Sequence, residues 1–154
     1  MLTAPQMQAL PAFFTDIPDP RRVQGRRHPL SVVLAIAAAA HLCGARGYKH
    51  IAEWAENLSQ SARQRFGCRC VARRYLVPSE SIIRDLLIRV DPQHLERALQ
   101  GWNAQFSPAD ASLAIDGKTM CNATDERGAQ THIMSVIGHD TGACYTQKKS
   151  AACR

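Results

Sequence analysis

The stretch LSVVLAIAAAAHLC, residues 30–43, decides how the first part of the chain folds, because it is the longest apolar run in the sequence. It is shorter than the roughly 18 apolar residues that a membrane span needs, and His41 lies inside it. Pro29 precedes the run, where a missing backbone N–H does not weaken a helix. The run therefore predicts a buried core helix and no membrane partner.

Helical periodicity surrounds this run and continues to about Phe106. The segments 48–58, 78–90 and 91–106 each place apolar residues on one face at helical spacing. The glycine-bracketed turn GARG, residues 44–47, joins the first two helices. This arrangement is compatible with a helix-turn-helix, and equally with an ordinary helical hairpin.

The pattern changes after residue 108. The short runs SLAID (112–116), THIMSVIG (131–138) and ACYTQ (143–147) are typical of strands, and SLAID is expected to be buried. The sequence therefore predicts an α+β chain. An all-helical domain over residues 1–108 is followed by three strands in a domain over residues 109–154.

The charge of the chain favours an anionic partner. It has 19 lysines and arginines against 13 aspartates and glutamates, a net charge of +6, and nucleic acid is the commonest partner of such a protein. Arginines gather in RRVQGRRH (21–28) and in SARQRFGCRCVARRY (61–75), which contains no acid. The second run is either a phosphate-contacting surface or a solvated basic face. The candidate DNA-binding residues are Arg21, Arg22, Arg26, Arg27, Arg69, Arg73 and Arg74.

The cysteines and the N-terminal sequence indicate the cellular compartment in which the protein is expected. The opening MLTAPQMQALPAFF lacks the basic and apolar regions of a secretory signal, so a cytoplasmic protein with reduced thiols is expected. Cys68 and Cys70 form a C-x-C, but a zinc finger or ribbon has two pairs of the form C-x₂₋₄-C, and a second pair is missing here. Thiols buried as small apolar groups are the better interpretation.

Asp116 follows an apolar run in LAIDGKTM, residues 113–120. It either ends a strand together with Gly117, or serves as a magnesium ligand at the end of that strand. Two-metal phosphoryl transfer needs several converging carboxylates. From these residues alone, the strand end is the favoured interpretation.

Four blocks, in order, resemble the H-repeat-associated, ISAs-type insertion-sequence transposases. The resemblance covers essentially residues 10–149. The four blocks are FFTDIPDPRRVQGRRHPLSVVLAIAAAAHLCGARGYKHIAEWAE (13–56), VPSESIIRDLLIRVDP (77–92), LAIDGKTM (113–120) and THIMSVIGHDTGACYTQKK (131–149). The resemblance implies a DDE-type catalytic domain with an RNase H-like fold, which cuts DNA at transposon ends and joins it to a target with a divalent metal.

The resemblance also assigns residues. It makes Asp116 the first acidic ligand, with Mg²⁺ as cofactor, and it brings Lys118 within reach of a phosphate, although a solvated lysine fits equally well. Met120 and Cys121 stand where the family usually has leucine and arginine. The family's second aspartate and its glutamate lie further along, on elements that these residues lack. The expectation is a truncated RNase H-like domain that does not cleave DNA by itself.

Two functions follow as hypotheses. In the first, the chain is a truncated DDE-type transposase, inactive alone. In the second, it is a DNA-binding remnant that occupies transposon ends, forms homo-oligomers, or associates with intact transposase as its regulator or inhibitor. The arginine-rich helical region is what the second hypothesis requires.

Overall fold

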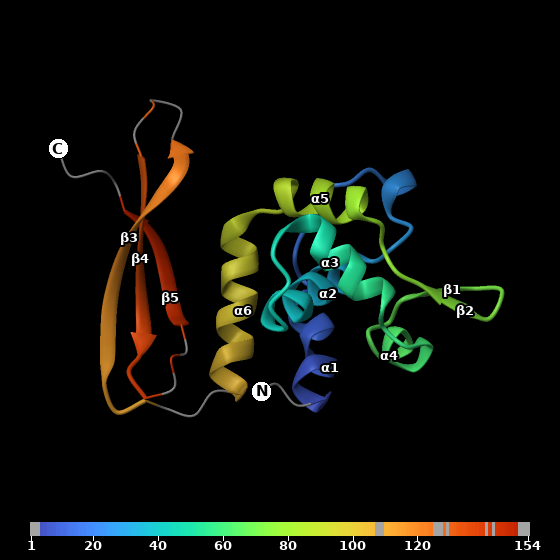
Figure 1. Ribbon diagram of the computed structural model, residues 1–154, viewed down its shortest axis with the longest axis horizontal. Helices are drawn as coiled ribbons and strands as arrows, with labels where there is room; N and C mark the ends of the chain where they lie inside the picture. The colour runs from blue at the N-terminus through green and yellow to red at the C-terminus, as the bar shows by residue number, and fades with distance from the viewer. Residues whose placement is uncertain are drawn as a thin grey trace. The chain divides into compact units, whose positions relative to one another are not determined.

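The computed structural model describes residues 4–106, 110–124, 128, 130–140, 142 and 144–150. The chain divides into two units, Met1–Leu95 and Glu96–Arg154. Helices come first and a three-stranded antiparallel sheet follows, so the predicted α+β class is confirmed (Figure 1). The elements are α1 (Ala4–Phe13), η1 (Val23–Gly25), α2 (Leu30–Leu42), α3 (Gly47–Glu56), α4 (Gln60–Arg65), β1 (Arg69–Val71), β2 (Arg74–Leu76), α5 (Glu80–Arg89), α6 (Pro92–Phe106), β3 (Leu113–Thr124), β4 (Gln130–Gly138) and β5 (Cys144–Ser150).

The division between the units falls inside α6. The domain boundary expected from the sequence, at 108/109, remains a prediction, because residues 107–109 lie outside the described residues.

Helix α2 forms the centre of the first unit, as the sequence predicts. It is apolar on all sides, which is typical of a helix surrounded by protein, and α1, α3 and α5 all pack against it. Its buried residues are Leu30, Val32, Val33, Leu34, Ala35, Ile36, Ala37, Ala39 and Ala40. Among the described residues, no single helix is both long and apolar enough to cross a membrane.

The amphipathic helices of the first unit are confirmed by their burial. Ile51 and Ala55 of α3 are buried, as are Ile83 and Leu86 of α5. At α6, the backbone N–H of Gln93 donates to Asp91 Oδ1 at 2.8 Å, which caps the helix.

The prediction that residues 1–108 are all-helical is wrong at residues 69–76. β1 and β2 form an antiparallel hairpin there, in which Val71 pairs with Arg74. Ala72 and Arg73 close the turn with φ values of +47° and +62°. Both signs match a type I′ turn, whose twist suits a two-residue hairpin.

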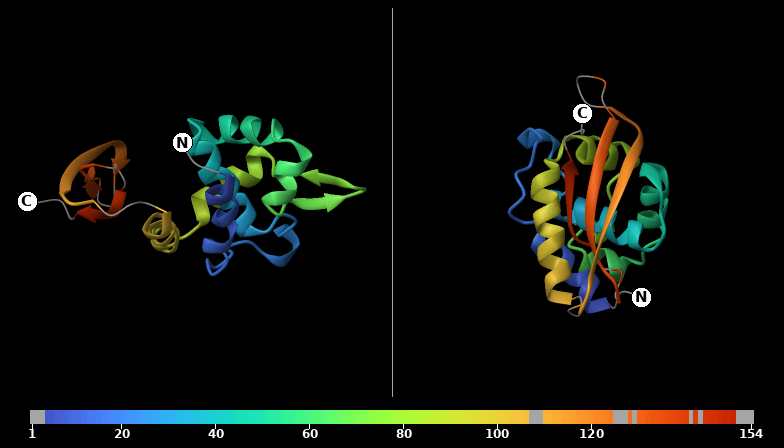
Figure 2. Two further views of the ribbon diagram at one scale, coloured as in Figure 1. Left: turned by 90° about the horizontal axis from the view of Figure 1, so that it is seen from below. Right: turned by 90° about the vertical axis from the view of Figure 1, so that its left-hand side faces the viewer.

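The sheet of the second unit has the strand order β3-β4-β5, and α6 lies along the outer edge of β5 (Figures 1 and 2). Asn103 Nδ2 donates to the carbonyl of Cys144 at 3.0 Å, and the N–H of Gln147 donates to Glu96 Oε1 at 2.9 Å. Side chains of α6 thus satisfy backbone groups on one edge of the sheet. In the described part of the chain, β3 forms the other edge and pairs only with β4.

The expectation that SLAID is buried is wrong. Leu113 is 59% exposed and Ile115 is 71% exposed, so the face of β3 that carries both side chains is uncovered in the described part of the chain. Asp116 and Gly117 do not end a strand either, since β3 continues to Thr124. Asp116 lies mid-strand, opposite Ser135.

The segment between α1 and α2 is held by a buried ion pair. Arg21, whose side chain is 5% exposed, donates to both carboxylate oxygens of Asp19 at 3.0 and 2.8 Å. Its remaining bonds go to the carbonyls of Gly25 at 3.1 Å and His28 at 2.8 Å. Burial alone would raise the pKa of Asp19, but hydrogen bonds from Arg21 and the charges of Arg21 and Arg26 lower it below its ordinary value.

We expect the substitution Asp19→Ala to lower the free energy of unfolding by about 3 kcal/mol, because it leaves the buried Arg21 guanidinium without its counter-charge. Urea denaturation followed by circular dichroism measures this change. The control Asp16→Ala removes an exposed carboxylate and should change the free energy by less than about 0.5 kcal/mol. Equal costs for the two variants would contradict a structural role for the pair.

The register of β3 predicts an alternating pattern of amide exchange. The N–H of His139 donates to the carbonyl of Ser112 at 3.0 Å, so these two opposite residues form a hydrogen-bonded pair. Pairs alternate along an antiparallel ladder, and Asp116 opposite Ser135 is again a hydrogen-bonded pair.

We therefore expect the amides of Asp116 and Lys118 to exchange more slowly than those of Ile115 and Gly117, which point toward the free edge of β3. Hydrogen exchange measured residue by residue by NMR tests this. Uniform slow exchange along residues 114–118 would show that another strand covers the edge.

Candidate nucleic-acid interface

The β1–β2 hairpin is anchored to α4 along one edge. Tyr75 of β2 donates its backbone N–H to Gln60 Oε1 at 2.7 Å, and its carbonyl accepts from Arg63 Nη1 at 3.1 Å. Ser59 caps α4 by accepting from the N–H of Ala62 at 3.2 Å. Two hydrogen bonds between side chains of the capped helix α4 and the backbone of Tyr75 therefore fix the direction in which the hairpin projects.

The arginines of this region divide into two groups. Arg63 is structural, because it donates to the carbonyls of Leu58, Tyr75 and Glu56 at 2.6 to 3.1 Å. The others are exposed, and within the described residues none of them has a hydrogen-bond or ion-pair partner. They are Arg65, Arg69, Arg73 and Arg74. No acid occurs between residues 57 and 79 to neutralise them.

The segment 19–28 shows the same division. Arg21 is buried and fully engaged by Asp19 and main-chain carbonyls. Arg26 donates to the carbonyl of Arg21 at 3.0 and 2.9 Å. Arg22 and Arg27 are exposed, and no partner for either occurs in the described part of the chain. Of the four predicted DNA-binding residues in this segment, Arg21 and Arg26 thus hold the loop in place. Arg22 and Arg27 are exposed to solvent.

His28 lies where charges of both basic segments act on it. This side chain is only 8% exposed, and its Nδ1 has no hydrogen-bond partner among the described residues. Burial lowers the pKa of His28, and the charges of Arg69 and Arg21 lower it further. Arg69 of the hairpin therefore lies close to the 19–28 segment, although more than 40 residues separate them.

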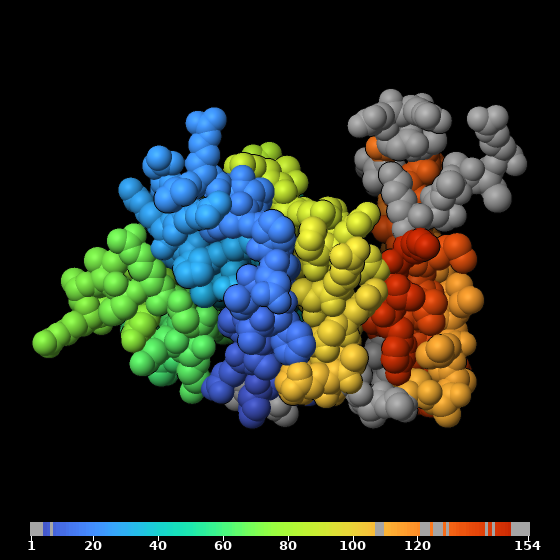
Figure 3. Space-filling model, turned by 180° about the vertical axis from the view of Figure 1, so that it is seen from behind, coloured from blue at the N-terminus to red at the C-terminus, as the bar shows by residue number. Residues whose placement is uncertain are grey.

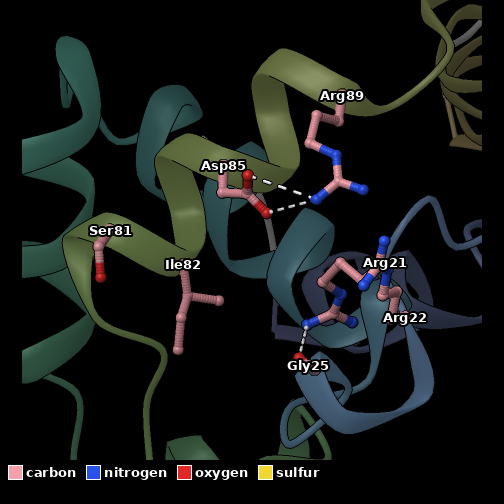
Figure 4. Close-up of a pocket in the computed structure, with 7 residues that line it drawn as sticks. All are labelled: Arg21, Arg22, Gly25, Ser81, Ile82, Asp85 and Arg89. Atoms are coloured by element: carbon pink, nitrogen blue, oxygen red, sulfur yellow. Dashed lines mark hydrogen bonds and ion pairs between the residues drawn. The ribbon is translucent and has the colours of Figure 1, made fainter.

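A cavity of about 390 Å³ lies where the 19–28 segment meets α5 (Figure 4). Arg89 crosses this junction, donating to the carbonyl of Pro20 at 2.5 Å and to Asp85 at 3.1 Å. Arg22 is the lining arginine for which the described residues offer no partner. The lining residues are Arg21, Arg22, Gly25, Ser81, Ile82, Asp85 and Arg89. The excess of arginine over aspartate suits an anionic group.

The sequence did not connect Arg89 to this surface. Asp85 and Arg89 are spaced to pair on one helix face, which the sequence shows. Their proximity to Pro20 and Arg22 arises only from packing of distant segments.

The α2–α3 pair has the geometry but not the charge of a DNA-reading helix-turn-helix. The axes bend by 101°, within the range of that motif. The exposed face of α3, however, carries Glu53 and Glu56, and Lys49 lies 3.8 Å from Glu53. With two glutamates and one lysine, this helix offers no excess of positive charge to a phosphate backbone.

Asp116 and Lys118 lie in the second unit, on the same face of β3, and both are exposed. Among the described residues, no group of three or more histidines, cysteines, aspartates or glutamates could hold a metal ion. Cys68, considered above for zinc, is buried, and that burial raises the pKa of its thiol.

Comparison with known proteins places this geometry in context. The profile of a family described as DDE_Tnp_1-associated matches residues 12–103, which include both basic segments and end before β3. An uncharacterized protein in the dhlA 3′ region of Xanthobacter autotrophicus is 28% identical over 142 residues, 89% of this chain and 46% of that protein. The chain thus spans about half the length of this curated relative. No solved structure matches the chain significantly.

We expect the stability of the fold to fall as the pH drops below 6.5, the ordinary pKa of histidine. The folded pKa of His28 is lower, so the unfolded chain binds more protons in this window, and acid favours unfolding. Thermal unfolding of wild type and His28→Gln between pH 7.5 and 5 tests this, and the variant should show the flatter profile.

His50→Gln is the matched control, since His50 is exposed on α3. It should keep the pH profile of the wild type. An unchanged profile in His28→Gln would contradict burial of His28 beside the two arginines.

Proposed function

Because the chain belongs to the DDE_Tnp_1-associated family, we propose that it serves DNA transposition as the DNA-binding part of a DDE-type insertion-sequence transposase. The H-repeat-associated, ISAs-type group is the proposed subgroup, on the four sequence blocks described above. DNA at the transposon ends is the proposed partner.

The exposed arginines that have no partner in the described part of the chain carry this proposal. Arg69, Arg73 and Arg74 line the hairpin, and Arg22 and Arg27 extend the same charge along the neighbouring segment. Guanidinium groups that the fold does not use remain available to phosphates, and each contact releases condensed counterions from DNA. Arg21 and Arg26 contribute indirectly, because they hold the segment that presents Arg22 and Arg27.

For the second unit, we propose that β3, β4 and β5 begin an RNase H-like sheet and that Asp116 is its first acidic residue. The described residues do not fit a complete Mg²⁺ site, because they bring no three candidate ligands together. Lys118, on the face of β3 that carries Asp116, is proposed to contact a phosphate. No chemical step follows from Asp116 alone.

A second candidate function is regulation of an intact transposase. The proposed DNA surface lies within the first unit, and Asp116 lies in the second. DNA binding therefore does not depend on catalysis. A chain of this kind would occupy transposon ends, as a homo-oligomer or together with intact transposase, in the cytoplasm.

Fluorescence anisotropy with a 20-base-pair duplex tests DNA binding. Three to four phosphate contacts should weaken binding about 40- to 150-fold between 50 and 200 mM salt, since each contributes roughly −0.9 to the slope of log affinity against log salt. The double substitution of Arg69 and Arg74 by alanine should reduce that slope by about 1.8, which corresponds to two phosphate contacts.

The substitution Arg97→Ala is the control, because it removes an exposed arginine of α6 outside the proposed surface. It should leave the slope unchanged. Failure of the wild-type chain to bind any duplex at 50 mM salt would overturn the proposed function.

A further inference from the structure

The hairpin projects from the first unit as a short arm (Figures 1 to 3). Each of its strands has three residues, which corresponds to a length of about 10 Å. Its outer end is not packed against any core, because every residue from Arg69 to Arg74 is exposed.

The dimensions of this arm suit the major groove of DNA. Paired strands lie about 4.8 Å apart, and with their side chains they fill much of a groove about 12 Å wide and 8.5 Å deep. The minor groove of undistorted B-DNA is only about 6 Å wide, so a ribbon would enter it only if the DNA were deformed. The length of the arm is also close to the depth of the major groove.

The register gives the two faces of the ribbon different chemistry. Opposite residues share a face, so Arg69, Val71, Arg74 and Leu76 lie on one side. Val71 and Leu76 are each 41% exposed. Burying their apolar surface against a partner would be favourable, because it removes that surface from water. A surface of guanidinium and aliphatic groups matches phosphates and thymine methyl groups.

The turn at the tip is strained. Ala72 and Arg73 adopt positive φ, which costs an L-residue free energy that glycine or asparagine would avoid. Backbone strain of this kind is found at functional sites. At Arg73 it keeps a guanidinium at the outermost point of the arm, where a glycine would make a more stable turn.

We propose that the β1–β2 hairpin enters the major groove of DNA as a two-stranded ribbon, with Arg73 contacting guanine edges and Arg69 and Arg74 contacting phosphates. The inference rests on the proposed function, since it takes DNA as the partner. It adds the groove, the inserted element and the residue that reads bases. Arginine donates two hydrogen bonds to guanine O6 and N7, and N7 is accessible only from the major groove.

The test compares two GC-rich 20-base-pair duplexes, one with guanine and one with 7-deazaguanine throughout. The modified base lacks N7 but keeps base pairing and the minor groove. The wild-type chain should bind the modified duplex about 5-fold more weakly, which corresponds to the loss of one hydrogen bond worth about 1 kcal/mol.

The substitution Arg73→Ala should bind both duplexes equally. The double variant Ala72→Asn, Arg73→Gly gives the turn its preferred sequence, so the hairpin stays folded, and it should also lose the preference. The control Arg84→Ala removes an exposed arginine of α5 and should keep the 5-fold ratio.

Equal binding of the two duplexes by the wild-type chain would overturn the inference. So would a preference that persists in the Asn-Gly variant. In either case a normal salt dependence would leave the proposed function standing. Absence of binding to both duplexes at 50 mM salt would instead remove the proposed function itself.

Discussion

The ion pair between Asp19 and Arg21 is the constraint on which the first unit and its basic surface depend. Two charges taken out of water are favourable only when their hydrogen bonds are satisfied, and here the guanidinium also binds the carbonyls of Gly25 and His28. These bonds close the 19–28 segment directly before α2 begins. They hold the backbone that carries the exposed Arg22 and Arg27, and the same backbone places His28 where the charge of Arg69 lowers its pKa. The basic surface combines two stretches that are distant in the sequence, residues 22–28 and 69–76. The carboxylate of Asp19 holds the first of them in place.

Arginines in this chain serve two physical roles that composition does not separate. Arg21 and Arg63 donate hydrogen bonds to main-chain carbonyls and thereby hold loops in place. Arg22, Arg69, Arg73 and Arg74 are exposed, and among the described residues none of them has a hydrogen-bond or ion-pair partner. The first group holds the backbone segments that carry the second, and an ordered backbone loses less conformational entropy on binding an anion than a mobile one.

The sequence predicted the elements whose signal is local. Helix α2 was evident because it is apolar on every side, and α5 because its apolar residues recur at helical spacing. The hairpin was missed because its turn contains Ala72 and Arg73 in place of asparagine and glycine. The strand end expected at Gly117 was wrong, since glycine can continue a strand as well as break it. Which arginines turn inward could not be predicted, because their partners are carbonyls that only the folded chain brings near. The roles proposed for Asp116 and Lys118 stay predictions.

The central claim is that residues 22–28 and 69–76 form a single surface for DNA. Amide NMR spectra of the ¹⁵N-labelled full chain, recorded with and without a 20-base-pair duplex, test it most directly. The account predicts that chemical shifts change in both segments together, while the buried residues of α2 keep theirs. Changes confined to residues 96–154, or binding that leaves the hairpin unperturbed, would contradict it.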